Sequence, residues 1–537
     1  MVLIIVVLSS SLVLARGLNS EYITLWDEAV HLNVVQNLIT HCCTPRLHVR
    51  DLGTDYRDWT DNDVWLHKPP IPFFINAALA APWPRSPLAL RMPALLFAEA
   101  LVVVVFLLGL RFFDRSSAAL AAAAFAFNRY TFDLVQGRQF SGMPDLTLAF
   151  CLLGALYCLL AITESERQRH FVAFGVCSGA AFLCKDGLAF IPFIVLGAVV
   201  AKLGWRRHAR GFVCAGVVAV LIAGTSAACL AWLFPVETRY EQQRRLAHLF
   251  ENVEGWSRPA DYYFTAYFTR VTSPLIAGLG YLCVGWGLLQ WRRKPATAVL
   301  AMWVATYLVV LTPAVSKISD FIYPIAPVLY VLIAVALVQQ WRSRGYDRIV
   351  AASTAVLAAA LIIHFGLLGS HQWMVRAPSW RSRIAPPAIG VTIFGLSIAI
   401  LRLSRIRITR GLAALSTGAA VLVALGTSVR ANLAGPDLRP RDYDRQMALR
   451  QATLALPPDL RLRDDVVLVK WSGVKKSHLY VRFWAGLESL EITAANPLDR
   501  QMAVVRRVPD VYLLADAPDP QHEPALRVGP GYLYKIR

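Results

Sequence analysis

The sequence is poor in cysteine and lacks the spacings that usually accompany metal or redox chemistry. It has nine cysteines in 537 residues, and no Cys-x-x-Cys or other zinc-type spacing occurs among them. Most of them lie singly within apolar stretches. Cys42 and Cys43 are the exception, and a disulfide between two adjacent residues would be strained and rare. No zinc site is therefore expected.

Charged residues are also scarce, whereas long apolar runs are frequent. Only 17% of the residues are charged and 56% are hydrophobic, with a mean hydropathy of +0.48. Most runs are long enough to cross a bilayer core of roughly 30 Å. Residues 1–15 could be a secretory signal, but they lack its basic start, so they are interpreted as a first membrane helix. The chain is predicted to be a polytopic α-helical membrane protein.

We predict about thirteen membrane spans, near residues 2–16, 88–110, 116–130, 143–162, 170–184, 187–201, 211–234, 272–290, 297–313, 319–340, 349–368, 384–401 and 411–429. Alternate short loops between them are rich in Lys and Arg: "RFFDR", "ERQR", "KLGWRRHAR", "WRRK", "WRSRGYDR" and "RLSRIRITR". The positive-inside rule makes these loops cytoplasmic. The net charge of +19 is therefore mainly a topology signal, and we expect no nucleic-acid partner.

Parity then places the remaining loops and the C-terminus outside the membrane. Residues 1–430 form the predicted membrane domain, with long external loops at 17–87 and 235–271. In the first loop, apolar residues recur every four positions from Trp26 to Leu38, which predicts an amphipathic helix in the membrane interface. "LHKPPIPFFINAALAAPWP" predicts a second interfacial helix that prolines open.

The composition changes near residue 435, where the long apolar runs end. "DVVLVKW", "HLYVRFWAG", "VPDVYLLAD" and "GYLYKIR" are typical of short strands, and "RDYDRQMALRQATLAL" is typical of a helix. Residues 435–537 are therefore predicted to form a small external, periplasmic α/β domain. The domain has no phosphate-binding loop and no nucleophile elbow.

The pair Asp27 and Glu28 follows the first apolar segment closely. One interpretation is helix capping, because Thr24 and Asp27 have the spacing of a capping box. The other is catalysis, in which Asp27 acts as a general base on an acceptor hydroxyl. His31 lies one helical turn further on the same face and could orient Asp27. Glu28 points about 100° away and has no assigned role beyond a supporting one.

Lys68, in "WLHKPP", precedes a helix that prolines open, so its charge would lie beside free backbone N–H groups. This arrangement suits a phosphate, although a lysine that reaches to the headgroup region is the alternative. His67 is a supporting candidate. Asp145, in "GRQFSGMPDLTLAF", lies at the outer end of a span, where a buried acid usually has a function. Arg138 lies nearby and could pair with it.

Lys317 occupies a short external turn, and Tyr323 follows just inside the next span. Together they could help to hold a phosphate, although an interfacial anchor is the alternative. Lys185 and Asp186 form another outer turn, where we expect their charges to neutralise each other. "DLGTDYRDWTDND" is acidic but does not match a calcium-binding EF-hand loop, so a solvated loop is expected. No metal site is assigned, although a divalent ion is not excluded.

Six stretches resemble, in the same order, the motifs of the GT-C glycosyltransferases, in the branch of lipid A aminoarabinose transferases and protein O-mannosyltransferases. They are "WDEAVHLNVVQNLI", "WLHKPPIPFFINAAL", "LRMPALLF", "GRQFSGMPDLTLAF", "GAAFLCKDGLAFIPF" and "SKISDFIYPIAPVLYVL". The resemblance covers about residues 20–340. The predicted spans and external C-terminal domain also resemble the aminoarabinose-transferase architecture.

The resemblance implies an inverting transfer of a sugar from a polyprenyl-phosphate donor on the outer face of the inner membrane. Asp27 and Asp145 match the first and second acidic motifs, and Asp27 matches the catalytic acid. Lys68 and Lys317 match positions near the donor phosphate. The chain departs from the family where His31 replaces a common tyrosine and where Asp186 replaces a glycine.

These expectations leave the sugar and the acceptor open, with lipid A, another glycolipid or a protein hydroxyl as the candidates. We expect a monomer among membrane lipids, with no required cofactor. The alternative function is a polytopic transporter or flippase for a lipid-linked or small substrate. Transporters often contain internal repeats and ionisable residues at mid-membrane depth, and neither is evident in this sequence.

Overall fold

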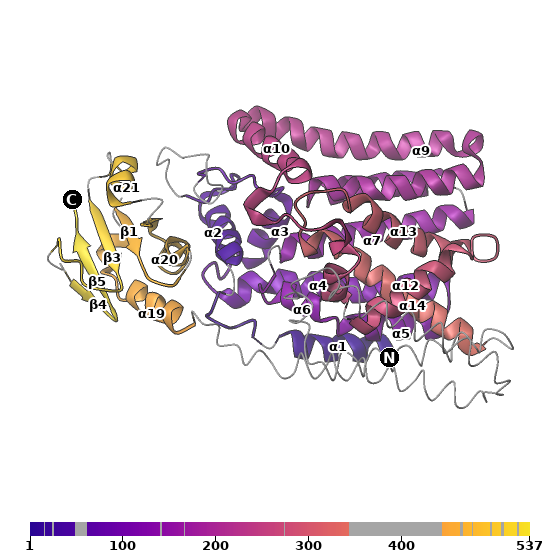
Figure 1. Ribbon diagram of the computed structural model, residues 1–537, viewed down its shortest axis with the longest axis horizontal. Helices are drawn as coiled ribbons and strands as arrows, with labels where there is room; N and C mark the ends of the chain where they lie inside the picture. Colours follow the sequence, from indigo (N-terminus) through magenta and orange to yellow (C-terminus); the bar gives the residue numbers. More distant parts are fainter. Residues whose placement is uncertain are drawn as a thin grey trace.

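The structure is a computed structural model that describes most of residues 1–342 and 443–537. The gaps within these ranges are residues 16, 24–25, 49–61, 140–141, 166, 273, 462–464, 475, 494–496, 506–507, 509 and 523–525. The last three predicted spans, from 349 to 429, lie outside the described residues. A long bundle of helices carries a small α/β domain at one end (Figure 1).

The bundle contains the helices that match the predicted spans. They are α1 (Val2–Leu14), α4 (Pro87–Phe112), α5 (Arg115–Ala126), α7 (Met143–Ser165), α8 (Gln168–Phe182), α9 (Ile191–Leu233), α12 (Pro274–Leu288), α13 (Pro295–Leu311) and α14 (Ile325–Arg342). Their facing sides form one continuous apolar core, in which α7 and α14 are buried along most of their length.

Helix α9 is a hairpin of two antiparallel helices rather than one rod. Gly204 has a φ angle of 111°, a conformation that glycine adopts without strain. The rings of Phe193 and Phe212 are 6.3 Å apart, whereas nineteen residues of straight helix would separate them by roughly 28 Å. The two halves of α9 correspond to the spans predicted near 187–201 and 211–234.

Three helical segments among the described residues are long and apolar enough to cross a membrane: Pro87–Phe112, Met143–Ser165 and Gly187–Leu233. The last of these contains the hairpin at Gly204. Shorter apolar helices accompany them, such as α1 with 13 residues and α13 with 17, fewer than the roughly 20 that span a bilayer core. The chain is a multi-pass membrane protein, but the predicted count of about thirteen spans is not confirmed.

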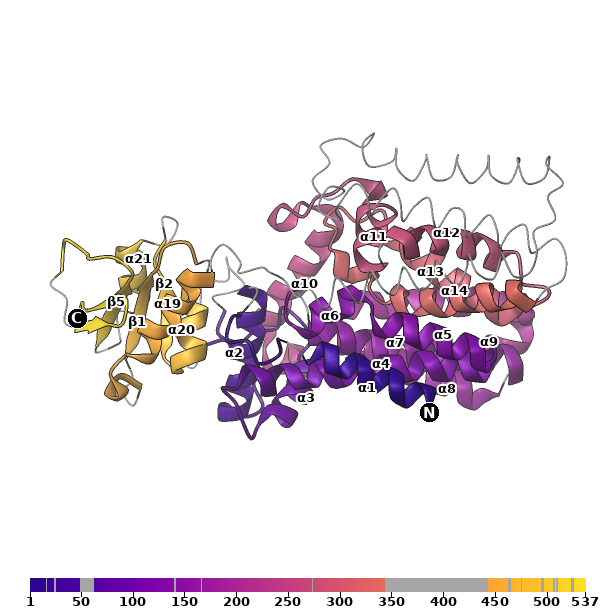
Figure 2. The ribbon, with the colours of Figure 1, turned by 90° about the horizontal axis from the view of Figure 1, so that it is seen from below.

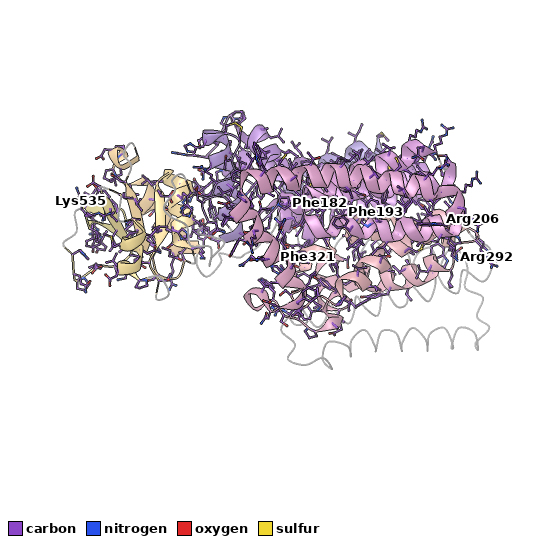
Figure 3. All side chains as sticks on the ribbon, turned by 90° about the horizontal axis from the view of Figure 1, so that it is seen from above. Phe182, Phe193, Arg206, Arg292, Phe321 and Lys535 are labelled. Atoms are coloured by element: carbon purple, nitrogen blue, oxygen red, sulfur yellow. A yellow bond between two sulfur atoms is a disulfide. The ribbon has the colours of Figure 1, made fainter. Side chains whose placement is uncertain are left out.

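The basic turns gather at the end of the bundle that is remote from the α/β domain. Arg111 pairs with Glu164 at 2.7 Å, and Arg342 pairs with Asp114 at 3.1 Å, so three of the predicted cytoplasmic loops meet. Figure 3 places Arg206 and Arg292 at this same end, whereas Lys535 lies at the opposite end of the molecule. The predicted cytoplasmic loops and the α/β domain thus lie at opposite ends of the bundle, and the side of the membrane that each end faces stays a prediction.

A layer of shorter helices covers the other end of the bundle, beside the α/β domain (Figure 1). Its elements are α2 (Trp26–His41), α3 (Ile71–Ala80), α6 (Arg129–Val135), α10 (Pro235–Phe250) and α11 (Ala266–Thr272), with the short turns η1 (Asp186–Phe190), η2 (Val253–Gly255), η3 (Ala260–Tyr263) and η4 (Ser319–Ile322). We call this set the external layer, after the sequence prediction that its loops lie outside the membrane.

Helix α2 does not use its apolar stripe in the way the sequence predicted. Val30, Val34 and Leu38 are at most 5% exposed, and they belong to a core cluster that includes Leu479 and Phe483 of the α/β domain. Protein side chains rather than lipid therefore cover this stripe. Thr24, the proposed capping partner of Asp27, lies outside the described residues.

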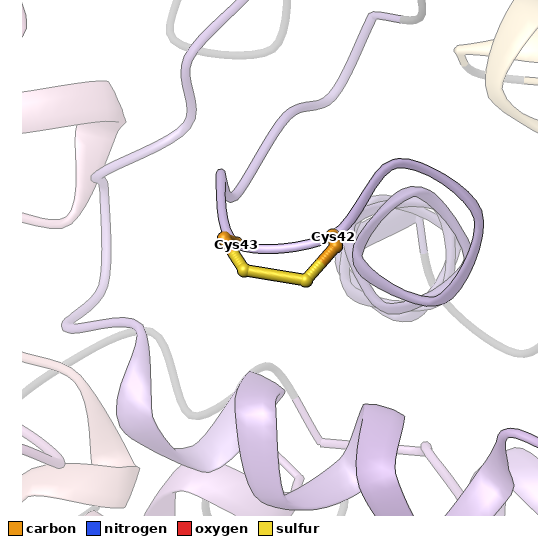
Figure 4. The surroundings of a disulfide bond; sticks show 2 residues. All are labelled: Cys42 and Cys43. Atoms are coloured by element: carbon orange, nitrogen blue, oxygen red, sulfur yellow. A yellow bond between two sulfur atoms is a disulfide. The ribbon is translucent and has the colours of Figure 1, made fainter.

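A disulfide joins Cys42 and Cys43 directly after α2 ends (Figure 4). Their adjacency had suggested that such a bond would be rare, and the structure differs from that expectation. The chain makes a tight turn here, in which the N–H of Thr44 donates to the carbonyl of Cys42 at 3.0 Å.

The α/β domain contains a five-stranded mixed sheet with the order β2-β1-β3-β5-β4. Its elements are α19 (Tyr443–Leu454), η5 (Pro458–Arg461), β1 (Val466–Lys470), α20 (Ser477–Ala485), β2 (Glu488–Glu491), α21 (Leu498–Val504), β3 (Val511–Ala515), β4 (Leu526–Val528) and β5 (Gly531–Lys535). Strand β1 pairs in parallel with β2 and β3, and β5 is antiparallel to β3 and β4. The small C-terminal sheet is confirmed.

One element of this domain was predicted wrongly. "HLYVRFWAG" is typical of a strand, but the structure folds Ser477–Ala485 into helix α20, which ends at Gly486 with a φ of 68°. Every residue of α20 is buried, so no exposed face marks the segment as a helix. A short run rich in aromatic and β-branched residues is typical of a strand, and its length alone does not distinguish a buried strand from a buried helix.

Arg91 of α4 ties the bundle to the external layer. Its Nε donates to Glu28 at 2.6 Å, and its other nitrogens donate to the carbonyls of Leu18, Ser20 and Tyr22 at 2.7–3.0 Å. Both side chains of the Arg91–Glu28 pair are at most 6% exposed. Glu28 is therefore a structural anchor of α2, and it points away from its neighbour Asp27.

We expect Arg91→Met to destabilise the protein by about 3–5 kcal/mol, because it leaves the Glu28 carboxylate buried without its cation. The free energy of unfolding in detergent micelles measures the effect. The matched control is Arg111→Met, whose partner Glu164 is 39% exposed, and which should cost about 0–1 kcal/mol. Equal losses in the two variants would contradict the anchoring role.

Candidate active site

The site begins at Asp27, in the first turn of α2. Its side chain is largely buried, with the residue 7% exposed. Glu28, the next residue, binds Arg91 in the bundle, so the carboxylates of Asp27 and Glu28 interact with different parts of the fold. Asp27 lies close enough to Lys68 to raise the pKa of that ammonium group. The two sequence candidates are therefore neighbours in the fold.

Lys68 lies just before α3, which the two prolines at 69–70 open. Its Nζ is 3.0 Å from Nε2 of His31, one turn beyond Asp27 on α2. Burial lowers the pKa of Lys68, and the carboxylates of Asp27, Asp145 and Asp320 act in the opposite direction. Three carboxylates, from α2, α7 and η4, thus act on the one ammonium group of Lys68.

His31 is held between Lys68 and aromatic rings. Its ring centroid lies 5.7 Å from that of Trp65 and 5.2 Å from that of Phe73. Burial, followed by the charge of Lys68, lowers the pKa of His31 well below its usual value. The neutral imidazole can then accept a hydrogen bond from the Lys68 ammonium through Nε2.

Asp145 and Lys185 form the second part of the site. Asp145 opens α7 and is fully buried, and its Oδ1 accepts a hydrogen bond from Lys185 Nζ at 2.7 Å. The sequence had suggested Arg138 as the partner of Asp145, but Arg138 lies 3.5 Å from Asp133 instead. The break between α8 and η1 brings Lys185 to the start of α7, because α7 and α8 pack side by side.

Lys185 therefore pairs with Asp145, whereas the sequence had suggested Asp186 as its partner. Its ammonium lies 4.8 Å from the ring centroid of Phe321, over the face of that ring. Lys185 also acts on Lys68, whose pKa it lowers. The ammonium groups of Lys68 and Lys185 therefore lie near each other at this end of the bundle. Their mutual repulsion favours a bound anion between or beside them.

Asp320 is a further buried acid of this cluster, only 1% exposed. It accepts a hydrogen bond from the hydroxyl of Tyr130, which also lies 2.9 Å from the Ser319 hydroxyl. Tyr323 is fully buried nearby, with its hydroxyl 2.9 Å from Thr131 Oγ1. Sequence reasoning missed Asp320, although it lies inside the "SKISDF" stretch that carried Lys317.

Asp27, Lys68, Asp145, Lys185 and Asp320 together are called the acid–lysine cluster. They come from α2, the segment before α3, α7, the break before η1, and η4. Each position belongs to one of the motifs that resembled the GT-C pattern. For Lys185 a signal was therefore present in the sequence, but the adjacent Asp186 offered a simpler local partner.

Lys317 lies apart from this cluster. Its Nζ donates to the carbonyl of Arg258 at 3.2 Å and to that of Ala314. Burial lowers the pKa of Lys317, and Asp261 partly offsets this effect. A cavity of about 440 Å³ opens beside it, lined by residues that include Arg258, Phe264, Thr312 and Lys317. The structure does not bring Lys317 together with Lys68.

Helix α10 of the second external loop braces the segment that carries Lys68. His67 Nδ1 lies 3.1 Å from Glu241 Oε2, and Arg245 donates to the carbonyl of Leu66 at 2.8 Å. Burial lowers the pKa of His67, although its hydrogen bond with Glu241 acts against the shift. Both long external loops therefore take part in shaping the site.

No group of three or more His, Cys, Asp or Glu side chains that could hold a metal ion occurs among the described residues. Most of the acidic stretch 51–63 lies outside them.

The lowered pKa of His31 predicts a loss of stability in acid. The unfolded chain has a His pKa near 6.5, and so it binds more protons than the folded chain between that value and the lowered one. Stability is fully present above about pH 6.5 and is lost as the pH falls through this window. His31→Gln keeps an acceptor for Lys68 but does not titrate.

We expect the melting temperature of the wild type to fall more steeply between about pH 6.5 and 5 than that of His31→Gln. Thermal unfolding at several pH values measures this slope. His41→Gln, at the exposed end of the same helix, is the control and should behave as the wild type does. A slope that His31→Gln leaves unchanged would refute the assignment.

Residues 67–232 match the family model described as dolichyl-phosphate-mannose-protein mannosyltransferase. None of the curated proteins matches the sequence. The family match covers the segment from His67 to the second half of α9, and it contains Lys68, Asp145 and Lys185.

Several solved structures share the fold. ArnT from Cupriavidus metallidurans, bound to undecaprenyl phosphate, is 15% identical, with a TM-score of 0.63 over 99% of this chain and 97% of that chain. The oligosaccharyltransferase AglB from Archaeoglobus fulgidus, in complex with an inhibitory peptide and a dolichol-phosphate, is 12% identical, with a TM-score of 0.53 over 96% and 69%.

The arabinosyltransferase EmbB from Mycobacterium smegmatis is 15% identical, with a TM-score of 0.52 over 81% of this chain and 40% of that chain. The matched family and these three neighbours are all glycosyltransferases of the GT-C class. The ordered motifs of the sequence resembled the same class. The chain thus has the GT-C fold, and its resemblance to the GT-C glycosyltransferases is confirmed.

Proposed function

We propose that the protein is an inverting glycosyltransferase of the membrane, which moves a sugar from a polyprenyl-phosphate donor to an acceptor on the outer face. The acid–lysine cluster carries the proposal. It combines a buried carboxylate, Asp27 of α2, with Lys68 just before α3, at the end of the bundle that carries the α/β domain. The complexes of ArnT with undecaprenyl phosphate and of AglB with a dolichol-phosphate support a lipid-linked donor.

The donor phosphate is proposed to bind at Lys68. As the bond between the sugar C1 and the phosphate oxygen breaks, both electrons stay on the leaving oxygen, and a fixed ammonium group stabilises that charge. His31 holds the Lys68 ammonium at 3.0 Å. Asp145 already pairs with Lys185, so this acid competes less for Lys68.

Asp27 is proposed to act on the acceptor. With a hydroxyl acceptor, Asp27 takes the proton as the acceptor oxygen bonds to C1 from the face opposite the phosphate. One displacement of this kind inverts the sugar configuration. If the acceptor is an ionised phosphate, as on lipid A, there is no proton to remove and Asp27 orients the acceptor. Mass spectrometry of lipid A, other glycolipids and envelope proteins, with and without this protein, identifies the acceptor.

One prediction concerns Asp27 as the base. Asp27→Asn keeps the shape of the side chain but does not accept a proton, so we expect transfer to a hydroxyl acceptor to fall by at least about 100-fold. Release of polyprenyl phosphate from its sugar-linked form measures the rate. Glu21→Gln is the control, because Glu21 is 53% exposed and pairs with Arg450. If Asp27→Asn works at the wild-type rate, the assignment fails.

The second prediction separates the two lysines. Lys68→Met should lower kcat by about 10²–10³, because it removes the charge that stabilises the leaving phosphate. Lys317→Met should have a smaller effect, because Lys317 lies outside the acid–lysine cluster beside a separate cavity. The same release assay gives kcat and the KM of the donor for both variants.

Lys317 and Tyr323 remain candidates for the donor phosphate from the sequence pattern. A rise of about tenfold in donor KM for Lys317→Met, the scale of one charge-assisted contact, would retain Lys317 as a donor contact. An unchanged donor KM would remove it. A kcat in Lys68→Met that matches the wild type would overturn the proposed role of Lys68.

A further inference from the structure

The α/β domain packs directly on the helix that carries Asp27. Helices α19 and α20 lie between its sheet and α2 in both views of the ribbon (Figures 1 and 2). Apolar side chains from α2, α3 and the domain share one buried core cluster. The domain is therefore joined to the external layer by a packed interface.

Gln446, on α19, makes two hydrogen bonds to the backbone just before α2. The Gln446 amide oxygen accepts from the N–H of Ile23 at 2.8 Å, and its amide nitrogen donates to the carbonyl of Ile23 at 2.9 Å. Gln446 and Ile23 are both fully buried. This two-point contact fixes the backbone four residues before Asp27.

Helix α20 continues the contact along α2. Asn33 donates to the carbonyl of Leu479 at 2.9 Å, and Gln36 donates to that of Phe483 at 3.4 Å. Both acceptors lie inside α20, and both donors lie on α2 beyond Asp27. The interface thus holds α2 before and after the proposed base.

A buried ionic network joins the domain to the segment after α2. Arg482 donates to the carbonyl of Leu47 at 2.8 Å and lies 3.0 Å from Glu488, which lies 2.8 Å from His48. The three side chains are at most 2% exposed. Charges at such depth are tolerated only when they are paired, so this network favours one docked position of the domain.

We propose that the C-terminal domain completes the candidate active site, with Gln446 as a positioning residue for Asp27. Two contacts hold the chain on either side of Asp27. Gln446 of the domain binds the backbone of Ile23, and Arg91 of the bundle binds Glu28. Lys68 lies on the segment before α3, which α10 braces. The domain therefore sets the distance between the base and the lysine.

The inference rests on the proposed function for the role of Asp27, but the contact itself is independent of it. A misplacement of about 1 Å in a reacting group can lower a rate by about 100-fold. Loss of the Gln446 contact should therefore lower kcat while leaving the donor KM unchanged, because the donor phosphate is held at Lys68.

The test is Gln446→Leu in the full-length protein, which removes both hydrogen bonds and keeps an apolar side chain of similar size. We expect hydrogen exchange of the first-turn amides of α2 to accelerate about tenfold, the scale of one or two lost hydrogen bonds. We expect kcat to fall about tenfold or more, with the donor KM unchanged. Amides of α7 should exchange as in the wild type.

The control is Lys535→Gln, which removes the exposed pair with Asp510 at the far end of the domain (Figure 3). It should change neither the exchange of α2 nor kcat. If Gln446→Leu does not fold, Asn33→Leu provides the second variant, since it cuts the contact with Leu479 on the other side of Asp27.

Faster exchange of α2 together with a lower kcat and an unchanged donor KM supports the proposal. Unchanged exchange, or faster exchange with an unchanged kcat, overturns it, and the domain would then be a scaffold or an acceptor-recruiting module. If the wild type releases no polyprenyl phosphate from any sugar-linked form, the proposed function fails. The exchange measurement then still decides whether the domain holds α2.

Discussion

The structure depends on the pairing of buried charges at the end of a membrane bundle that lies beside the α/β domain. Asp145 meets Lys185 at 2.7 Å, and Glu28 meets Arg91 at 2.6 Å. Lys68, with a lowered pKa, lies beside His31. Unpaired charges in such surroundings cost several kcal/mol each. These pairs are therefore satisfied only when α2, α4, α7 and the break before η1 meet in one arrangement.

The same requirement accounts for the chemistry that the site can perform. The charges of Asp145–Lys185 and Glu28–Arg91 neutralise each other within the fold, and Asp27 and Lys68 are the pair proposed to carry the function. Three carboxylates and a second lysine act on the ammonium group of Lys68. The proton on this group is therefore held in balance, and the negative charge of an arriving phosphate would stabilise it. His31 stays neutral through burial and so supports Lys68 without repelling it. A lipid-linked phosphate and an acceptor hydroxyl are the partners that this division of roles suits.

Prediction from the sequence succeeded where the signal was local and repeated. Apolar run length and basic turns predicted the bundle helices, the hairpin within α9 and the end at which Arg206 and Arg292 lie. Prediction failed where a residue's partner was distant in sequence. Lys185 was assigned to its neighbour Asp186 rather than to Asp145, forty residues away. Helix α20 was taken for a strand, because its short run of aromatic and β-branched residues is typical of strands and tertiary packing decided otherwise.

The sequence by itself determined the membrane class, the topology signal and the order of motifs that contain Asp27, Lys68 and Asp145. These features follow from composition and short-range spacing, which need no knowledge of the fold. Only the tertiary structure decided that Lys185 and Asp320 join the cluster, that Lys317 lies apart, and that the C-terminal domain grips α2 through Gln446. The reason is that burial and charge pairing act between segments far apart in the chain, and the lowest free energy of the whole arrangement selects the partners.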